Sequence, residues 1–345
     1  MGTGIIRKTK GGEASVLYVP NDNRDCYYNM AVEEHVFFEL DQRESYILLW
    51  QNDPTIVVGR FQNTIEEVNR DFTIERGIKV VRRLSGGGAV YHDQGNLNFT
   101  FIEPRTPGKD TAFESFTQPV IAALKDLGLD AAFSSRNDIT VGNRKVSGNA
   151  QYMTSTRVLH HGTLLVDTDF SILEQALKVS SDKIASKGIK SVRSRVANIS
   201  DFLLEPIPME ELKQHLLQHI FGGQQIQTYI LSATEQERIR RLAQEKYSTW
   251  DWVWGRSPKY NFHNAKRFAA GQVEIRLDVQ QGRIAQAKIY GDFFGHRDVA
   301  EVEQRLRGIR FERADIRSTL SHFELEEFFG PISLEELMTL FQVAN

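Results

Sequence analysis

Three consecutive glycines separate two apolar runs within residues 77–102. GIKVVRR (77–83) and NLNFTFI (96–102) each have the composition of a β-strand, and LSGGGAVYHDQG lies between them. Glycine loses more backbone freedom on folding than any other residue. Three in succession therefore indicate a loop, joining two strands of one sheet, where something requires a bare backbone.

The first two thirds of the chain predict a mixture of strands and helices. Residues 29–40 read as a helix capped by Asn29, and DITV and RKVSG read as a hairpin around Gly142-Asn143. The other expected strands are 46–50, 55–60 and 162–167, and the other expected helices are 64–70 and 113–127, the latter closed by Gly128. This order of elements predicts an α+β fold with a mixed sheet.

The pattern changes after residue 205 and suggests a second domain. Polar-faced helices are expected at 209–220 and 233–246, and an aromatic stretch follows at 248–255. Beyond it, strands are expected at 273–279 and 284–290 and helices at 298–308 and 333–342. We therefore expect a large domain over residues 1–247 and a small α/β domain over 248–345.

Composition excludes several classes of protein. The 345 residues carry a formal net charge of −3, which argues against nucleic acid as the main partner. A single cysteine, Cys26, cannot form an intrachain disulfide. No apolar run approaches the roughly 20 residues that span a membrane, and the N-terminus lacks a signal-peptide core. We expect a cytoplasmic protein that does not enter membranes.

The glycine loop matches neither of the common nucleotide-binding motifs. No Gly-Lys-Ser/Thr follows it, and the spacing of a dinucleotide fingerprint is absent. A flexible connection between strands is one interpretation. The other is a ligand site, because bare amides admit an anion or a flat ring, and Arg83, Ser85 and His92 add donors.

The segment RNDITVGNRKVSGNAQ (136–151) holds a second group of candidate residues. If Val146 enters the core, Lys145 leaves on the opposite face of the strand. A lone lysine is usually a solvated surface group, but here Ser147-Gly148 follows it. Asn137-Asp138 could hold ribose, Mg²⁺ or pyrophosphate, or could merely form an Asx turn.

Two further segments are candidates. HHGTLL (160–165) places tandem histidines at a strand, either as local packing or as part of a site. SKGIKSVRSRV (186–196) is basic, and it is either a solvated face or a lid over phosphates.

These four segments, in this order and spacing, resemble the lipoate–protein ligase A family from about residue 25 to 345. The resemblance implies a catalytic domain like those of biotin ligases and class II aminoacyl-tRNA synthetases, plus an accessory domain. It implies activation of lipoate by ATP, with Mg²⁺, to lipoyl-AMP and pyrophosphate. The lipoyl group then passes to a lysine of a carrier domain, on the E2 subunit of a 2-oxoacid dehydrogenase or the glycine-cleavage H protein. No prosthetic group is implied.

The resemblance also assigns roles to individual residues. Lys145 matches the essential lysine that touches the lipoyl carbonyl and the phosphate. The positions implied to bind lipoate or lipoyl-AMP are Trp50, Arg83, Ser85, Gly87, His92, Ser147 and His161. Those implied to bind ATP or adenylate are Arg83, Gly88, Ala89, Val90, Tyr91, Asn137, Asp138, Lys145, Lys187 and Arg193, with Asp138 also a Mg²⁺ contact.

Other functions remain open at the level of sequence. An ATP-independent octanoyl or lipoyl transferase of the same superfamily is the main alternative, but such enzymes usually work through an acyl-cysteine. Cys26 lies outside all four motifs, ahead of the first expected helix, where a buried packing role is expected. A non-catalytic binder is disfavoured by Lys145, and a biotin ligase would carry a different glycine motif.

Overall fold

The computed structural model describes residues 16–105, 112–134, 137–177, 195–254, 261–280 and 282–341. The described chain divides into two compact units. Unit 1 takes in the residues up to Val57, Val68–Val81 and Val90–Thr249. Unit 2 takes in Val58–Glu67, Arg82–Ala89 and the residues from Trp250 onward.

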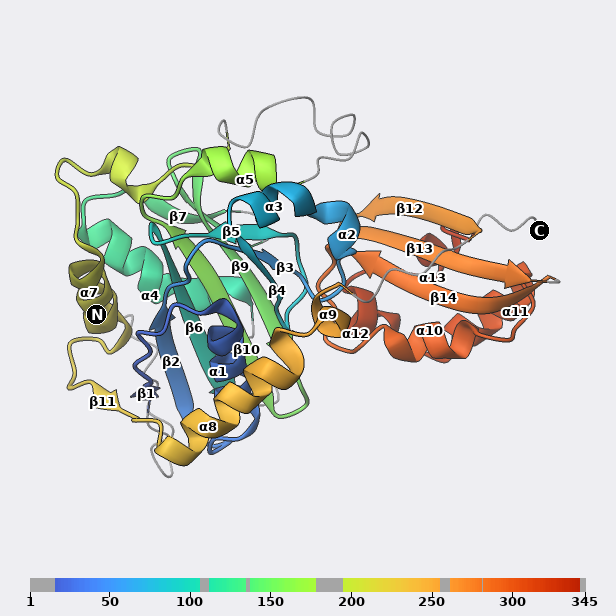
Figure 1. Cartoon of the computed structure of the whole chain (residues 1–345), viewed down its shortest axis with the longest axis horizontal. Coiled ribbons are helices and arrows are strands. Elements are labelled where there is room, and N and C mark those ends of the chain that lie inside the picture. The colour runs from blue at the N-terminus through green and yellow to red at the C-terminus, as the bar shows by residue number, and fades with distance from the viewer. Residues whose placement is uncertain are drawn as a thin grey trace. The chain divides into compact units, whose positions relative to one another are not determined.

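An eight-stranded mixed sheet is the centre of unit 1 (Figure 1). Its strand order is β11-β1-β2-β6-β10-β9-β8-β7. The strands are β1 Val16–Tyr18, β2 Ser45–Trp50, β6 Asn96–Pro104, β7 Ala131–Ser134, β8 Asp138–Val141, β9 Arg144–Met153, β10 Arg157–Leu165 and β11 Gln227–Thr228. The central strands pair antiparallel, and β1 pairs parallel with both of its neighbours.

Helices cover the sheet on its two faces. On one face, α4 (Phe113–Asp126) and α7 (Met209–Ile220) bury the main apolar core against alternate residues of β2 and β6, including Leu49, Phe99 and Phe101. On the other face lies α1 (Cys26–Phe38), whose Glu33 bonds Thr100 of β6. The period of two along each strand thus separates an apolar face from a face that carries polar side chains.

A second sheet contains the strands on either side of the glycine loop. Its three strands are β3 (Thr55–Val58), β4 (Lys79–Arg82) and β5 (Val90–His92), in the order β4-β3-β5. The glycine loop connects β4 to β5. The expectation that it joins the strands 77–83 and 96–102 in one sheet was wrong, because the short strand β5 intervenes and β6 belongs to the large sheet.

Unit 2 has an antiparallel sheet of its own, in the order β12-β13-β14. Its elements are β12 Phe262–Phe268, β13 Gly271–Gln280, β14 Arg283–Gly291, α9 Trp250–Val253, α10 Ala300–Leu306, α11 Arg313–Leu320, α12 Leu325–Phe329 and α13 Leu334–Met338, with α2 Thr64–Glu67. Val273, Ile275 and Leu277 alternate into the core, as the strict alternation of the sequence predicts.

Several other expectations were confirmed or corrected. Helices 113–127 and 209–220 and the hairpin at Gly142-Asn143 are present. The first helix begins at Cys26 rather than Asn29, because the Asp25 carboxylate caps it by accepting from the N–H groups of Tyr27 and Tyr28. The expected helix 64–70 is α2 followed by α3 (Arg70–Glu75).

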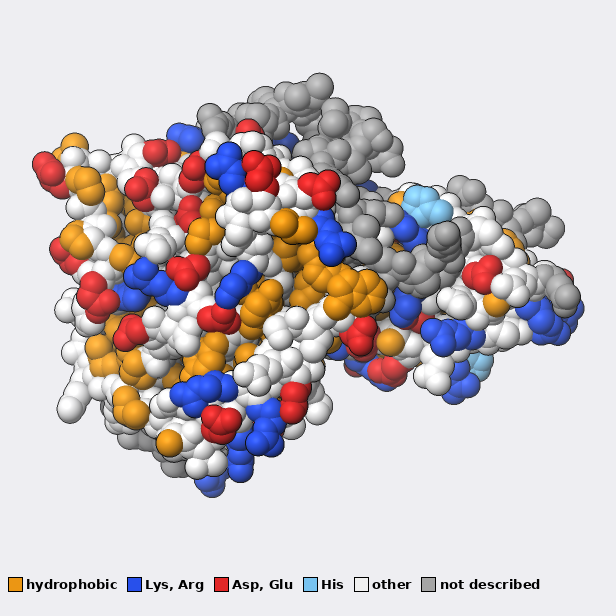
Figure 2. Space-filling view, in the orientation of Figure 1, with side chains coloured by type: hydrophobic (Ala, Val, Ile, Leu, Met, Phe, Trp, Pro, Cys, Tyr) orange, Lys and Arg blue, Asp and Glu red, His pale blue; other side chains and the backbone are white. Residues whose placement is uncertain are grey.

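The remaining elements of unit 1 are α5 (Phe170–Ala176), the 3₁₀ turn η2 (Ile199–Phe202), α8 (Ala233–Leu242) and the π-helical turn η3 (Ala243–Tyr247). The last two follow each other without a break, so the helix expected at 233–246 is confirmed, with a π-helical last turn. Within the described ranges, no helix is long and apolar enough to cross a bilayer. On the face drawn in Figure 2, acidic and basic side chains are interspersed over the surface.

Candidate active site on one face of the large sheet

A row of residues crosses five adjacent strands of the large sheet. Trp50 of β2 pairs with Asn98 of β6, and Asn98 pairs with Thr163 of β10. Thr163 lies beside Gly148 of β9, whose N–H donates to its Oγ at 3.3 Å, and Gly148 pairs with Asp138 of β8. Residues directly opposite one another in a sheet share a face. Four strand spacings make this row roughly 19 Å long.

A β-bulge places Lys145 on the same face as this row. The register shifts by one residue within the β8–β9 pair, so Ile139 faces Ser147 while Thr140 faces Lys145. Without the shift, residues 145 and 148 would point to opposite faces, but a Cβ on Gly148 would lie only 2.8 Å from the Lys145 Nζ. Val146 points into the core and is fully buried, as the sequence predicts.

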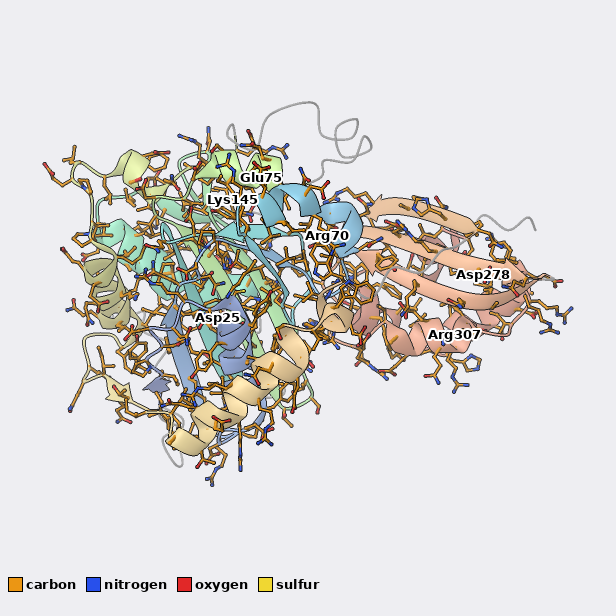
Figure 3. All side chains as sticks on the ribbon, viewed as in Figure 1. Asp25, Arg70, Glu75, Lys145, Asp278 and Arg307 are labelled. Atoms are coloured by element: carbon orange, nitrogen blue, oxygen red, sulfur yellow. The ribbon has the colours of Figure 1, made fainter. Side chains whose placement is uncertain are left out.

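The Lys145 side chain is held at both ends. Its ammonium lies 2.7 Å from Asp138 Oδ1, and both side chains are partly exposed. Its backbone is paired with the segment that follows residue 194, since Lys145 N–H donates to Arg195 O and Ala197 N–H donates to Lys145 O. The Lys145 ammonium is thus held at one end of the row; Figure 3 labels this residue.

Glu33 links two of the predicted residues, Trp50 at the other end of the row and His161 on its middle strand, β10. Its carboxylate accepts from Thr100 Oγ at 2.6 Å and lies 3.0 Å from His161 Nδ1. Thr100 in turn accepts from Trp50 Nε1 at 3.0 Å. All four side chains are at least nine-tenths buried. The indole and the imidazole are therefore positioned by one buried carboxylate.

The tandem histidines have separate roles because neighbouring strand residues point to opposite faces. His160 packs on the apolar side, stacked on Phe116 at 4.9 Å between ring centroids. Its Nδ1 accepts from Gln151 Nε2 at 3.1 Å and its Nε2 donates to Asn149 Oδ1 at 3.2 Å. Burial holds the pKa of His160 well below its usual range, so the ring stays neutral. Only His161 belongs to the site.

Asn149 organises the start of β8. Its Nδ2 donates to Asn137 O at 3.0 Å and to Ser147 Oγ at 3.2 Å, while Asn137 Nδ2 donates to Asn149 O at 2.7 Å. A Cβ on Gly162 would meet Asn149 Oδ1 at 2.2 Å, so this glycine is required by packing. Asn137 is thus held next to Asp138. The Ser147 side chain instead lies on the apolar side of the sheet with Asn149, because Ser147 pairs with the core residue Ile139.

His92 lies on β5 next to Trp50. The two rings meet edge to face with centroids 6.0 Å apart. His92 Nδ1 accepts from Asn52 Nδ2 at 3.1 Å, and Asn52 Oδ1 accepts from Asn29 Nδ2 at 2.9 Å. Asn29, expected as a helix cap, instead belongs to this buried amide network. Val90 and Tyr91 precede His92 on β5, and burial raises the pKa of Tyr91 to about 12.

The glycine loop is built around Arg83, within unit 2. The guanidinium donates to Ser85 Oγ at 3.0 Å and to the carbonyl oxygens of Gly86 and Gly88 at 2.6 and 2.8 Å. Ala89 ends the part of the loop that belongs to unit 2. In this structure the arginine therefore organises the loop itself.

The three glycines are required for different reasons. A Cβ on Gly86 would lie 2.3 Å from Phe293 O, so close backbone packing excludes a side chain there. Gly87 has φ +90°, in the region that favours glycine. Gly88 is exposed and its Cβ would meet nothing within 4 Å. Gly88 is therefore the position where the protein itself gives no reason for a bare backbone.

The candidate residues divide among three groups. Trp50, Asn137, Asp138, Lys145, Ser147 and His161 lie on the large sheet and His92 beside it, while Arg83, Ser85, Gly87 and Gly88 belong to the loop of unit 2. Lys187 and Arg193 fall outside the described residues.

Sequence reasoning missed Glu33, Thr100 and Asn149. The signal for Glu33 was a carboxylate within the apolar helical stretch NMAVEEHVFFEL.

Asp138 fits Mg²⁺ only as a single ligand. One of its oxygens is engaged by Lys145. Within the described ranges, no cluster of three or more histidine, cysteine or acidic side chains includes it. Mg²⁺ bound with a nucleotide normally takes one or two carboxylates, with phosphates and water supplying the rest. A metal here would therefore depend mainly on the nucleotide phosphates.

Cys26 is a packing residue. It is the first residue of α1, not ahead of it, and it is fully buried. Burial raises the pKa of its thiol to about 12. A nucleophilic cysteine needs the opposite, an accessible thiol with a lowered pKa.

Comparison with known sequences identifies both parts of the chain. Residues 25–221 match the lipoyl protein ligase A/B catalytic domain, and residues 257–341 match the bacterial lipoate protein ligase C-terminus. The lipoate-protein ligase LplJ of Bacillus subtilis is 47% identical over 329 residues, covering 94% of this chain and 99% of the relative. Lipoate–protein ligase 1 of Staphylococcus aureus is 46% identical over 324 residues, covering 94% and 99%.

Solved structures agree with the sequence matches. P. falciparum LipL1 in complex with lipoate has a TM-score of 0.76 at 25% identity, covering 90% of this chain and 95% of that one. A lipoate-protein ligase A bound with ATP has a TM-score of 0.60 at 29% identity, covering 70% and 98%. The bi-partite ligase of Thermoplasma acidophilum, described with its E2 lipoyl domain, has a TM-score of 0.62 at 29% identity, covering 72% and 100%. With both of its domains matched and relatives aligned over nearly its full length, the chain belongs to the lipoate–protein ligase family.

Proposed function

We propose that this lipoate–protein ligase forms lipoyl-AMP on the polar face of the large sheet and uses Lys145 in both half-reactions. Lipoate and ATP give lipoyl-AMP and pyrophosphate in the first step. In the second, a carrier lysine attacks the lipoyl carbonyl and AMP leaves. The row from Trp50 to Asp138, with Lys145 at its end, carries this proposal.

The row suits a long ligand with an apolar and an anionic end. Trp50 at one end and His161 on the middle strand supply a buried wall. Glu33 holds His161 directly and Trp50 through Thr100. Lys145 and Asp138 stand at the other end, with Asn137 nearby. An acyl chain beside Trp50 would place its carboxylate toward the lysine. ATP and lipoate are the molecules bound by relatives of this fold.

Lys145 reduces the electrostatic repulsion that opposes the first step. A carboxylate must approach an α-phosphate, so two anions are brought together. A preorganised ammonium neutralises that charge without having to reorganise during the reaction. In the second step the same group polarises the carbonyl under attack. Asp138 holds the ammonium in place through their ion pair.

The partners proposed are lipoyl carrier domains. An archaeal relative is described together with its E2 lipoyl domain, which supports E2 subunits of 2-oxoacid dehydrogenases; the glycine-cleavage H protein is proposed on the family resemblance alone. We also propose Mg²⁺ bound with ATP and touching Asp138, and a division at residues 247 and 248 between catalytic and accessory domains. The cytoplasmic location stays a prediction.

Pyrophosphate release tests the proposal against the transferase alternative. The chain should release pyrophosphate from ATP when lipoate is added, and should not do so with biotin or with an octanoyl carrier protein. Because Cys26 is buried, Cys26→Ser should retain most of the lipoate-dependent activity. Acyl transfer from the carrier without ATP, with an acyl group trapped on Cys26, would replace the ligase mechanism with the transferase one.

A further inference from the structure

A cluster of nitrogen and oxygen donors lies on unit 1 where α4 meets α7, which run side by side in Figure 1. Asp126 is the last residue of α4. His215 and His219 are four residues apart on α7, so they share one face of that helix. The two imidazole rings have centroids 4.5 Å apart. None of these residues belongs to the site proposed for ligation.

The donor atoms already approach the spacing of a metal site. Asp126 Oδ2 lies 3.7 Å from His215 Nε2 and 3.7 Å from His219 Nε2. The three ligand atoms lie within 4.8 Å of one another. A tetrahedral shell with bonds of about 2.0–2.1 Å separates its ligand atoms by roughly 3.3–3.4 Å. A small side-chain adjustment would therefore close the site.

The hydrogen bonds of His219 prepare it for this role. Its Nδ1 donates to the His215 carbonyl oxygen at 3.0 Å, which leaves the lone pair on Nε2, facing Asp126. A ring N–H that bonds a backbone carbonyl is the usual support of a metal-binding histidine, because it fixes the tautomer and the ring orientation.

His215 must give up one hydrogen bond to take part. Its Nε2 donates to Ala123 O at 2.9 Å, so ligation through that nitrogen moves the proton to Nδ1. The Ala123 carbonyl also accepts from the N–H of Leu127 at 3.2 Å, so it keeps a partner when the histidine leaves. The rearrangement thus leaves no buried carbonyl without a donor.

We propose that Asp126, His215 and His219 form a transition-metal site that ties the end of α4 to α7, with Zn²⁺ the cation that fits best. Two imidazoles and one carboxylate suit Zn²⁺, with water in the fourth position. The site is open to solvent, since the Asp126 side chain is 63% exposed and the histidines 17% and 25%. Bound metal would stabilise the fold, because its ligands come from two helices.

Titration of the full-length chain with Zn²⁺ tests the proposal, with Co²⁺ absorption as a second readout. The unaltered chain should bind one more Zn²⁺ than His219→Ala, or bind Zn²⁺ with an affinity at least about tenfold higher. Loss of even an outer partner of a metal ligand lowers metal affinity by about that factor. Asp126→Asn should weaken binding in the same direction. The matched control is His322→Ala, which removes an exposed histidine of unit 2 and should bind like the unaltered chain.

The melting temperature without metal is the control for misfolding. His219→Ala should melt at nearly the same temperature as the unaltered chain. Zn²⁺ should raise the melting temperature of the unaltered chain and of His322→Ala but not of His219→Ala. Equal Zn²⁺ binding by all variants, or an equal loss in His322→Ala, would overturn the proposal. So would a Co²⁺ spectrum that lacks the intense bands of tetrahedral coordination.

Discussion

At the scale of single residues, the three glycines show why a motif must be resolved position by position. Gly86 is required by the backbone of Phe293, and Gly87 is required by its positive φ. Neither requirement involves a ligand. Only Gly88 has open space beside it and a backbone conformation that other residues adopt. The sequence indicated that a bare backbone was needed, but not which glycine the fold itself requires.

The first prediction separates these roles. Gly88→Ala should leave the melting temperature nearly unchanged and weaken the binding of a non-hydrolysable lipoyl-AMP analogue at least about tenfold, or 1.4 kcal/mol. Gly86→Ala is the matched comparison and should lower the melting temperature, because its Cβ would meet Phe293 O at 2.3 Å. Calorimetric titration and thermal unfolding measure the two effects. Undiminished affinity in Gly88→Ala would mean that the loop glycines serve only the fold.

At the scale of elements, the hairpin of β8 and β9 shows which structural features sequence periodicity predicts and which it misses. The turn at Gly142-Asn143 and the opposite orientations of Lys145 and Val146 followed from the sequence and are confirmed. The bulge did not, because only Arg144 and Lys145 precede the extra residue on β9, too few to show a break in the period of two. Yet the bulge puts Lys145 over Gly148. The short strand β5 was missed because three residues are too few to show a period.

The tandem histidines of β10 give a prediction about pH. His160 is buried and neutral, with its pKa well below 6.5 in the folded chain, while the unfolded chain takes up a proton near 6.5. The contribution of the neutral His160 ring to the free energy of unfolding is therefore complete above about pH 6.5. It decreases as the pH falls below that value, by up to about 1.4 kcal/mol per pH unit.

His160→Gln tests this dependence. The variant should be less stable at pH 7.5, because the stacking on Phe116 is lost. It should also lose less stability than the unaltered chain between pH 6.5 and 5.5. His322→Gln, at an exposed site, should keep the original slope. Denaturant unfolding at several pH values is the measurement, and parallel profiles for the unaltered chain and His160→Gln would contradict it.

At the scale of the whole molecule, the sequence motifs are distributed over both compact units. The glycine loop packs within unit 2, although the strands that flank it in the sequence belong mainly to unit 1. The row from Trp50 to Asp138 lies in unit 1. Four motifs in order were enough to predict the family and the α+β fold. They could not reveal the buried Glu33 network, because it joins residues from α1, β2, β6 and β10 that are far apart in the chain.

Lys145→Ala, followed through both half-reactions, tests the central claim most directly. One assay measures single-turnover formation of lipoyl-AMP from lipoate and ATP, and the other measures transfer from supplied lipoyl-AMP to a carrier domain. Lys125→Ala, on the exposed side of α4, is the control, and melting temperatures confirm that both variants fold. The expected result is a loss of roughly 10²–10³ in each half-reaction for Lys145→Ala, as for removal of one preorganised donor, and no loss for the control. A folded Lys145→Ala protein that completes both steps at near the original rates would contradict it.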